Sequence, residues 1–290
     1  MKLGIFAPLT NPTCTPHMLT ELGRMAEGAG LDSIWLGEHV VIFDEMKSRY
    51  PGSPDGKLPI PKGSGLLDVV ATIGFLAAHT TTLRLGTGVS LLPQRSPVYS
   101  AKEFATLDWL SQGRIDLGIG VGWCREELEA CGVTWARRDA RCDEYVDVLR
   151  ALWVEDNTAF HGEFYDLPAC RLDPKPVQSG SMVPIIVGGH SNAALRRAAR
   201  VGRGWYGFAL PPHAVAEHLG RLDDELATVG RSRADIEVLV TPPAPASEEL
   251  IESYRELGVD RLLPIFVAAD VDGARTEVEK LAPLAGVAAA

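Results

Sequence analysis

Cysteine and lysine are both scarce in this chain of 290 residues, and neither forms a pattern that carries chemistry. The five cysteines are odd in number, and no two of them stand in C-x-x-C spacing, which argues against a disulfide framework and a zinc site. We therefore expect free thiols in a reducing compartment. A Schiff-base aldolase needs a lysine near a strand end. All the lysines lie elsewhere: Lys2, Lys47, Lys57, Lys62, Lys102, Lys175 and Lys280.

Long apolar runs and basic runs are absent as well. No window approaches the ~18 continuous apolar residues that a membrane-spanning helix needs, and the N-terminal apolar run is too short for a signal peptide. The formal net charge of −10, without a cluster of Lys and Arg, argues against a nucleic-acid surface. We expect a cytoplasmic protein whose partner is a small molecule, with neither membrane nor nucleic acid.

Short apolar runs alternate with amphipathic helical patterns eight times along the chain. The runs lack the alternation of half-exposed strands, which is typical of parallel strands covered on both faces. Eight such units without a break in composition predict a single (β/α)8 barrel domain over residues 1–290, with a doubly wound open sheet as the alternative. The expected strands are 3–7, 33–37, 83–90, 114–120, 184–188, 204–208, 236–241 and 261–266.

Two connections are too long to be simple turns. Residues 40–65 are rich in proline and glycine and follow the second expected strand, and residues 154–183 precede the fifth. Barrel active sites lie at the C-terminal ends of the strands. We therefore interpret 40–65 as a lid, with a disordered surface loop as the alternative.

Glycines gather at three expected strand ends, in "GTGV" (86–89), "GIGVGW" (118–123) and "VGGHSN" (187–192). They suggest that a flat or anionic group approaches the backbone there; crowding by neighbouring backbone is the alternative for 118–123. The G-x-G-x-x-G spacing of a dinucleotide site is not met. After Gly188 and Gly189, Ser191 or Asn192 can cap a helix whose N-terminus would attract a phosphate, and a plain turn is the alternative.

His39 is the candidate catalytic residue, because it follows Glu38 at the end of the second expected strand. Histidine titrates near neutrality and can move protons. Neighbours in a strand point to opposite faces, so we expect only one of the two to face the barrel centre. A structural histidine bonded to backbone is the alternative. Clustered metal ligands and a G-x-S-x-G nucleophile motif are both missing, which leaves chemistry supplied by a bound cofactor.

Three segments together resemble the bacterial luciferase-like family: "AEGAGLDSIWLGEHV", "LRLGTGVSLLPQRSPVYSAKEFATLDWLSQGRIDLGIGVGW" and "VPIIVGGHSNAALRRAARVGRGW". Its members are flavin- or deazaflavin-dependent oxidoreductases on a (β/α)8 barrel. The C-terminal "LGVDRLLPIFVAADVDGARTEVEKLA" is most similar to the branch that uses coenzyme F-420. The resemblance therefore implies hydride transfer between F-420 and a small organic substrate, in a homodimer. An FMN-dependent monooxygenase using reduced flavin and O2, and a non-catalytic flavin-binding protein, are the alternatives.

The resemblance also implies roles for individual residues. His39 would exchange a proton beside the reactive ring, and Gly88–Val89 would form a cis peptide behind it. Some sugar-phosphate dehydrogenases of the family place a glutamate where this chain has Trp123, which is then either an apolar wall or core. The ribityl phosphate would lie on Gly188, Gly189 and Ser191, and the other cofactor contacts implied are Glu38, Thr87, Gly88, Val89, Gly120, Gly122 and Trp123.

Overall fold

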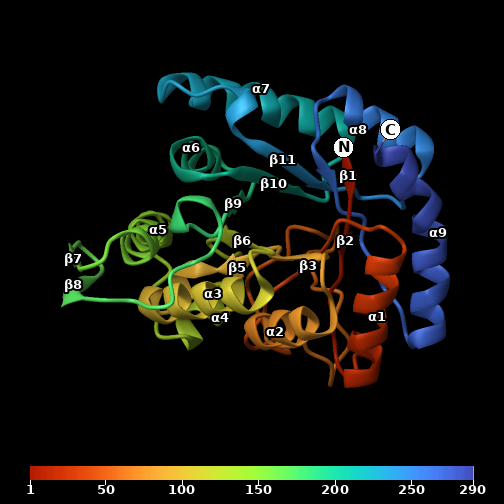
Figure 1. Ribbon diagram of the computed structural model, residues 1–290, viewed down its shortest axis with the longest axis horizontal. Coiled ribbons are helices and arrows are strands. Elements are labelled where there is room, and N and C mark those ends of the chain that lie inside the picture. Colours follow the sequence, from red (N-terminus) through yellow and green to blue (C-terminus); the bar gives the residue numbers. More distant parts are fainter. Residues whose placement is uncertain (290) are drawn as a thin grey trace.

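The sheet of this protein closes on itself through its first strand (Figure 1). The computed structural model describes residues 1–289. β1 (Lys2–Leu3) pairs with β12 (Arg261–Leu262), whereas β2 (Ile5–Phe6) pairs with β3 (Ser33–Leu36), and every pair in this sheet is parallel. The expected (β/α)8 barrel is confirmed, and the open sheet is excluded. Between β3 and β12 the order is β4 (Arg84–Thr87), β6 (Ile115–Gly120), β9 (Ile185–Gly188), β10 (Gly204–Phe208) and β11 (Glu237–Thr241), with the short β5 (Ser90–Leu91) paired to β6.

Eight helices, each between successive barrel strands or after the last, surround this sheet (Figure 1). Several of them begin with a side-chain cap: the Thr15 and Asp68 side chains, for example, accept backbone N–H bonds from Met18 and Ala71. None of the helices in residues 1–289 is long and apolar enough to cross a membrane. The helices are α1 (Pro16–Gly28), α2 (Val69–His79), α3 (Pro97–Ser111), α5 (Arg138–Val154), α6 (Asn192–Val201), α7 (Pro212–Thr228), α8 (Glu248–Glu256) and α9 (Val271–Ala289).

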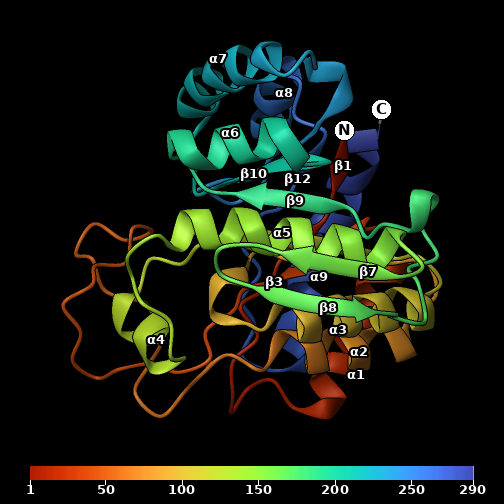
Figure 2. The same cartoon turned by 90° about the vertical axis from the view of Figure 1, so that its left-hand side faces the viewer.

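A short helix and a strand hairpin also lie between β6 and β9. A short helix, α4 (Arg125–Ala130), follows β6, and the 40–65 loop runs alongside it (Figure 2). The 154–183 connection contains an antiparallel hairpin of β7 (Thr158–His161) and β8 (Asp166–Cys170), which packs outside the barrel against α5 (Figure 2). The turn of the hairpin is bound to the first half of α5, where Glu144 accepts the backbone N–H groups of Phe164 and Tyr165.

The N-terminal end of the barrel interior is closed by ion pairs. Arg261 is only 3% exposed, and its guanidinium lies 3.0 Å from each of three carboxylates, Asp32, Asp116 and Glu237. Arg84 donates a second charged bond to Asp116, over 2.9 Å. Burial alone would raise the pKa of Asp116, but bonds from the two arginines hold it below its usual value.

Several barrel glycines leave room for a side chain or for backbone of a neighbouring segment. A Cβ on Gly86 would lie 2.5 Å from the Trp35 ring, and one on Gly118 would lie 1.8 Å from a backbone oxygen. At Gly120 and Gly188 the obstacle would be the Val89 side chain, at 2.5 and 2.6 Å. At Gly118 the obstacle is neighbouring backbone, as the alternative for 118–123 proposed, whereas Gly120 and Gly188 leave room for Val89.

Candidate active site

The His39 side chain lies at the C-terminal end of the barrel, bonded to a carboxylate from a distant helix. Its Nδ1 is 2.7 Å from Oε2 of Glu127, in the first turn of α4. Glu127 is fully buried, and its Oε1 accepts the backbone N–H of Val40 over 2.5 Å. Within the described residues, Nε2 of His39 has no hydrogen-bond partner. A carboxylate thus fixes one ring nitrogen and leaves the other for a ligand, so the alternative of a histidine bonded to backbone is wrong.

Glu38 and His39 both follow the end of β3 and bind different partners, so only one of them lies at the proposed site, as expected. Its carboxylate accepts bonds from the Ser90 hydroxyl (3.0 Å), the Leu91 backbone N–H (2.6 Å) and Nε of Arg95 (2.7 Å). Arg95 also contacts Glu103 at 3.2 Å. Glu38 therefore holds β3 against the segment after β4, and this geometry does not support the predicted cofactor contact.

The floor of the barrel mouth is apolar. The Gly88–Val89 peptide is cis, as the resemblance implied. Val89 and Phe208 are half-buried and cover the inner cluster that contains Phe6 and Tyr206. The Phe6 and Phe208 rings meet edge to face, with centroids 5.1 Å apart. Thr87, by contrast, is fully buried and donates its hydroxyl to the Gly118 carbonyl at 2.6 Å, so the geometry does not support its predicted cofactor contact.

Trp123 and Tyr50 form an aromatic wall beside His39. Gly122 has φ +77°, a backbone conformation that favours glycine, and the chain turns there before Trp123. The Trp123 ring meets the His39 ring at 5.5 Å and the Tyr50 ring at 5.2 Å between centroids. Trp123 is half-buried, which fits the apolar wall and not core. Tyr50 belongs to the 40–65 loop and was not among the predicted site residues. The one sequence feature that could have pointed to it is an aromatic residue in a stretch rich in proline and glycine.

Besides the bond from Val40 to Glu127, the 40–65 loop is tied to α4 through Glu126 and Ser48. Glu126 accepts the backbone N–H groups of Lys47 (2.6 Å) and Ser48 (3.2 Å), and the Ser48 hydroxyl accepts the N–H of Arg125 (3.0 Å). The bond with the Ser48 side chain, followed by backbone bonds, lowers the pKa of Glu126 to about 2. These hydrogen bonds attach the loop to α4 at residues 47 and 48, which a disordered surface loop would not show.

The N-terminus of α6 presents free backbone donors. Gly189 has φ +118°, and the Ser191 hydroxyl caps the helix by accepting the Ala194 N–H at 3.2 Å. In the part of the chain that the structure describes, the amides of residues 190–193 have no acceptor. Arg221 lies beside them, donating to Asn192. Free amides, a helix N-terminus and an arginine together suit an anion.

His190, which sequence analysis overlooked, directly follows β9 at the same helix N-terminus. Its Nε2 accepts the backbone N–H of Phe208 at 3.2 Å, and its ring stacks on His218. Burial, followed by the charges of His218 and Arg221, lowers the pKa of His190 to about 4. It is therefore neutral at pH 7. Among residues 1–289 no group of three or more His, Cys, Asp or Glu side chains could hold a metal ion.

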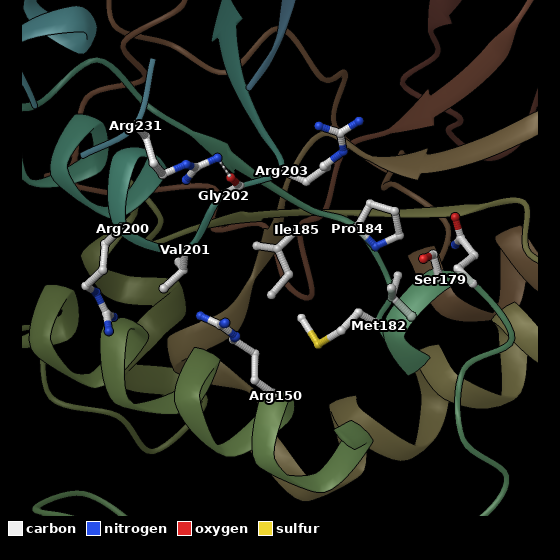
Figure 3. A pocket seen from close by; sticks show the side chains of 12 residues that line it. Arg150, Ser179, Met182, Pro184, Ile185, Arg200, Val201, Gly202, Arg203 and Arg231 are labelled. Atoms are coloured by element: carbon white, nitrogen blue, oxygen red, sulfur yellow. Dashed lines mark hydrogen bonds between the residues drawn. The ribbon is translucent and has the colours of Figure 1, made fainter. Parts of the chain in front are cut away.

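A hollow of about 530 Å³ lies at the opposite end of the barrel, where β9 begins (Figure 3). Arg150 and Met182 project into it, and Arg231 at its edge donates to the Gly202 carbonyl at 2.9 Å (Figure 3). Arg200 pairs with Asp147. Because this hollow is at the N-terminal end of β9 and His39 is at the C-terminal ends of the strands, we assign it no role in the chemistry.

Comparison with known proteins agrees with this architecture. The family model described as luciferase-like monooxygenase matches residues 1–277. An uncharacterized protein of Mycobacterium tuberculosis is 32% identical over 262 residues, 89% of this chain and 90% of the relative. A second from the same species is 39% identical over 184 residues, but the match spans only 62% of that relative. An F420-dependent glucose-6-phosphate dehydrogenase of Amycolatopsis mediterranei is 29% identical over 66% of this chain and 53% of its own.

Solved structures share the fold. An F420-dependent secondary alcohol dehydrogenase in complex with an F420–acetone adduct superposes with a TM-score of 0.81, at 18% identity over 99% of this chain and 98% of its own. The monooxygenase RslO1 from Streptomyces bottropensis gives 0.76, at 20% identity over 98% of both chains. With the family model matching nearly the whole barrel, the chain belongs to the luciferase-like monooxygenase family, whose members include F420-dependent oxidoreductases.

Proposed function

We propose that this protein is an F420-dependent oxidoreductase that exchanges a hydride with a small organic substrate, while His39 takes or gives the accompanying proton. The observation that carries the proposal is the His39–Glu127 pair at the open end of the barrel. The named relatives and a fold neighbour, all described as F420-dependent dehydrogenases, support the choice of cofactor.

The residues at the barrel mouth fit such a cofactor. The amides of residues 190–193 and Arg221 would hold its phosphate, because they offer charge and free N–H donors at a helix N-terminus. Val89 and Phe208 offer an apolar floor for a planar ring. When bound, a deazaflavin supplies a carbon that accepts or releases a hydride. Direct contacts of Gly120, Gly188, Gly189 and Ser191 with the cofactor stay predictions.

His39 and Glu127 would handle the proton. A neutral imidazole whose Nδ1–H donates to the Glu127 carboxylate presents Nε2 as an acceptor. When Nε2 takes a proton, the buried carboxylate stabilises the imidazolium and keeps the ring in place. Trp123 packs against the His39 ring and Tyr50 packs on Trp123, so aromatic side chains border the position where the proton moves.

Replacement of His39 tests this role. We expect His39→Ala to lower turnover with F420 by about 10²- to 10⁴-fold, the usual contribution of a general acid or base. The dissociation constant for F420 should stay within a few-fold of the parent, because His39 holds no group of the proposed phosphate site. Unchanged turnover would remove His39 from the mechanism.

A further inference from the structure

We propose that the hollow at the N-terminal end of the barrel is a further binding site, which takes an organic anion with an apolar body. The anionic group would be a carboxylate or a phosphate monoester, both of which arginine guanidinium groups bind. The inference goes beyond the proposed function and does not depend on it. Three observations carry it: the size of the hollow, its uncompensated positive charge and its apolar wall (Figure 3).

The hollow is large enough for a small organic molecule. Its volume of about 530 Å³ lies within the range of about 300–1,000 Å³ that is usual for ligand pockets. Its walls come from the C-terminal half of α5, the segment that leads into β9, the C-terminus of α6 and the turn after α7. Helices and a strand thus hold most of the site, and such elements position ligand-binding groups better than loops do.

The lining of the hollow is positive, although the chain as a whole carries a formal net charge of −10. In the part of the chain that the structure describes, the lining contains no aspartate or glutamate, but it contains Arg150, Arg200, Arg203 and Arg231. Arg200 is neutralised by Asp147, at 3.2 Å, and the Arg203 side chain points away from Arg150 (Figure 3). Arg150 and Arg231 are therefore the cations that an anion in the hollow would meet.

Arg150 is free to bind a ligand. Its side chain projects into the hollow from near the C-terminus of α5 (Figure 3). The carboxylates of Asp143 and Asp147, earlier on the same helix, are used instead by Arg197 and Arg200 of α6. Among residues 1–289 Arg150 forms no ion pair, so its planar set of N–H donors can bind both oxygens of an acid group.

Arg231 adds a charge without a counter-charge. Its half-buried guanidinium donates to the backbone carbonyls of Ala199 (2.6 Å), Gly202 (2.9 Å) and Asp235 (2.8 Å). Carbonyl oxygens carry only partial charges, so the full positive charge of Arg231 still acts on the hollow. The bonds to Ala199 and Gly202 also cover the negative end of the α6 dipole, which would otherwise repel an anion.

The rest of the wall is apolar. Met182, Pro184 and Val201 are half-buried, and Ile185 lies behind them at 2% exposure. Partly exposed apolar side chains beside a free guanidinium match a ligand with an apolar body and one charged end. Inorganic phosphate would use the cations alone and leave the apolar wall in water, so we expect it to bind more weakly.

A fluorescence titration with 2-naphthoate and 2-naphthyl phosphate tests the site, with 2-naphthamide as the uncharged control. We expect saturable binding of at least one anion, at least about tenfold tighter than that of the amide, because only the anions form charged bonds with the arginines. Tighter binding of the first anion identifies a carboxylic acid ligand, and tighter binding of the second identifies a phosphate ester. Binding of neither anion, or equal affinity for the amide, would overturn the inference.

Three variants locate the bound anion. Arg150→Gln should weaken its binding at least about tenfold, because the change removes the free charged donor. Arg196→Gln is the matched control, since this exposed arginine of α6 faces Glu225 and does not line the hollow. Arg221→Gln alters only the anion site at the other end of α6 and should bind the anion as the parent does. An unchanged affinity in Arg150→Gln, or a loss confined to Arg221→Gln, would contradict the inference.

Discussion

Nδ1 of His39 lies 2.7 Å from Oε2 of Glu127, although 88 residues separate the two in the chain. The bond joins the segment after β3 to the first turn of α4, and among residues 1–289 neither oxygen of the buried carboxylate is paired with an arginine or lysine. Glu127 is therefore committed to the His39 ring and to the backbone that follows it.

Glu127→Gln should lower kcat by about 10- to 100-fold with little change in F420 affinity, because the amide keeps the shape but removes the charge that supports protonated His39. Combined with His39→Ala, the loss should be far from additive, since the two residues act as one unit. Glu129→Gln, an exposed position on the same helix, is the control. Equal kcat values in Glu127→Gln and the control would show that the pair has no catalytic role.

Glu126 should control the opening of the 40–65 loop. In Glu126→Gln the amide is a weaker acceptor for the loop N–H groups, so trypsin should cleave at Lys47 or Arg49 several-fold faster than in the parent. Because folding lowers the pKa of Glu126 to about 2, its contribution is present above the ordinary value near 4.5 and is lost as pH falls toward 2. Loop protection that F420 leaves unchanged would contradict the interpretation as a lid.

Arg261 should be essential to stability and not to chemistry. Arg261→Met leaves the buried Asp116 and the partly exposed Asp32 and Glu237 with one counter-charge fewer, which we expect to cost about 3–5 kcal/mol in urea unfolding. Arg200→Met removes an exposed ion pair and should cost less than ~1 kcal/mol. A small loss in both variants would mean that these carboxylates find other partners or take up protons.

The Gly120–Val89 contact offers a test of barrel packing. Gly120→Ala places a methyl group against Val89 and should destabilise the protein by about 1–3 kcal/mol. Val89→Ala removes the obstacle, so the double variant should recover part of the loss, as a double-mutant cycle in urea would show. If the two losses simply add, the methyl group must meet something other than Val89.

Arg221→Gln tests the anion site at the N-terminus of α6. Removing the charge beside the free amides should weaken F420 binding about tenfold, since a charged hydrogen bond contributes about 1.5–3 kcal/mol and the amides remain. The effect should shrink in high salt. Arg233→Gln, which removes an ion pair with Asp223 outside this site, should bind F420 as the parent does.

The barrel was predictable from the sequence because its strands are buried on both faces and so stand out as apolar runs. The expected 204–208 coincides with β10, and 184–188 differs from β9 by one residue. The β7–β8 hairpin was not predictable, because most of its residues are exposed and no apolar pattern marks them. The expected divergence of Glu38 and His39 is observed, although both residues lie beyond the end of β3.

The partner of His39 could not be found from the sequence. Glu126 and Glu127 are adjacent acidic residues in the first turn of one short helix, and nothing in their spacing distinguishes them. Only the packing of α4 against the end of β3 turns Glu127 inward to His39 and leaves Glu126 for the 40–65 loop. The glycine clusters were also ambiguous. A glycine that makes room for a cofactor and a glycine that makes room for the Val89 side chain look the same in the sequence.

A side-by-side fluorescence titration of the purified protein with F420 and FMN tests the central claim most directly. We predict tight binding of F420 and binding of FMN weaker by at least about tenfold, with Arg221→Gln lowering the affinity for F420. Preference for FMN, with oxygen consumption by the reduced complex, would instead support a monooxygenase. Binding of neither would contradict the proposed function and leave the segment after Gly189 an ordinary capped turn.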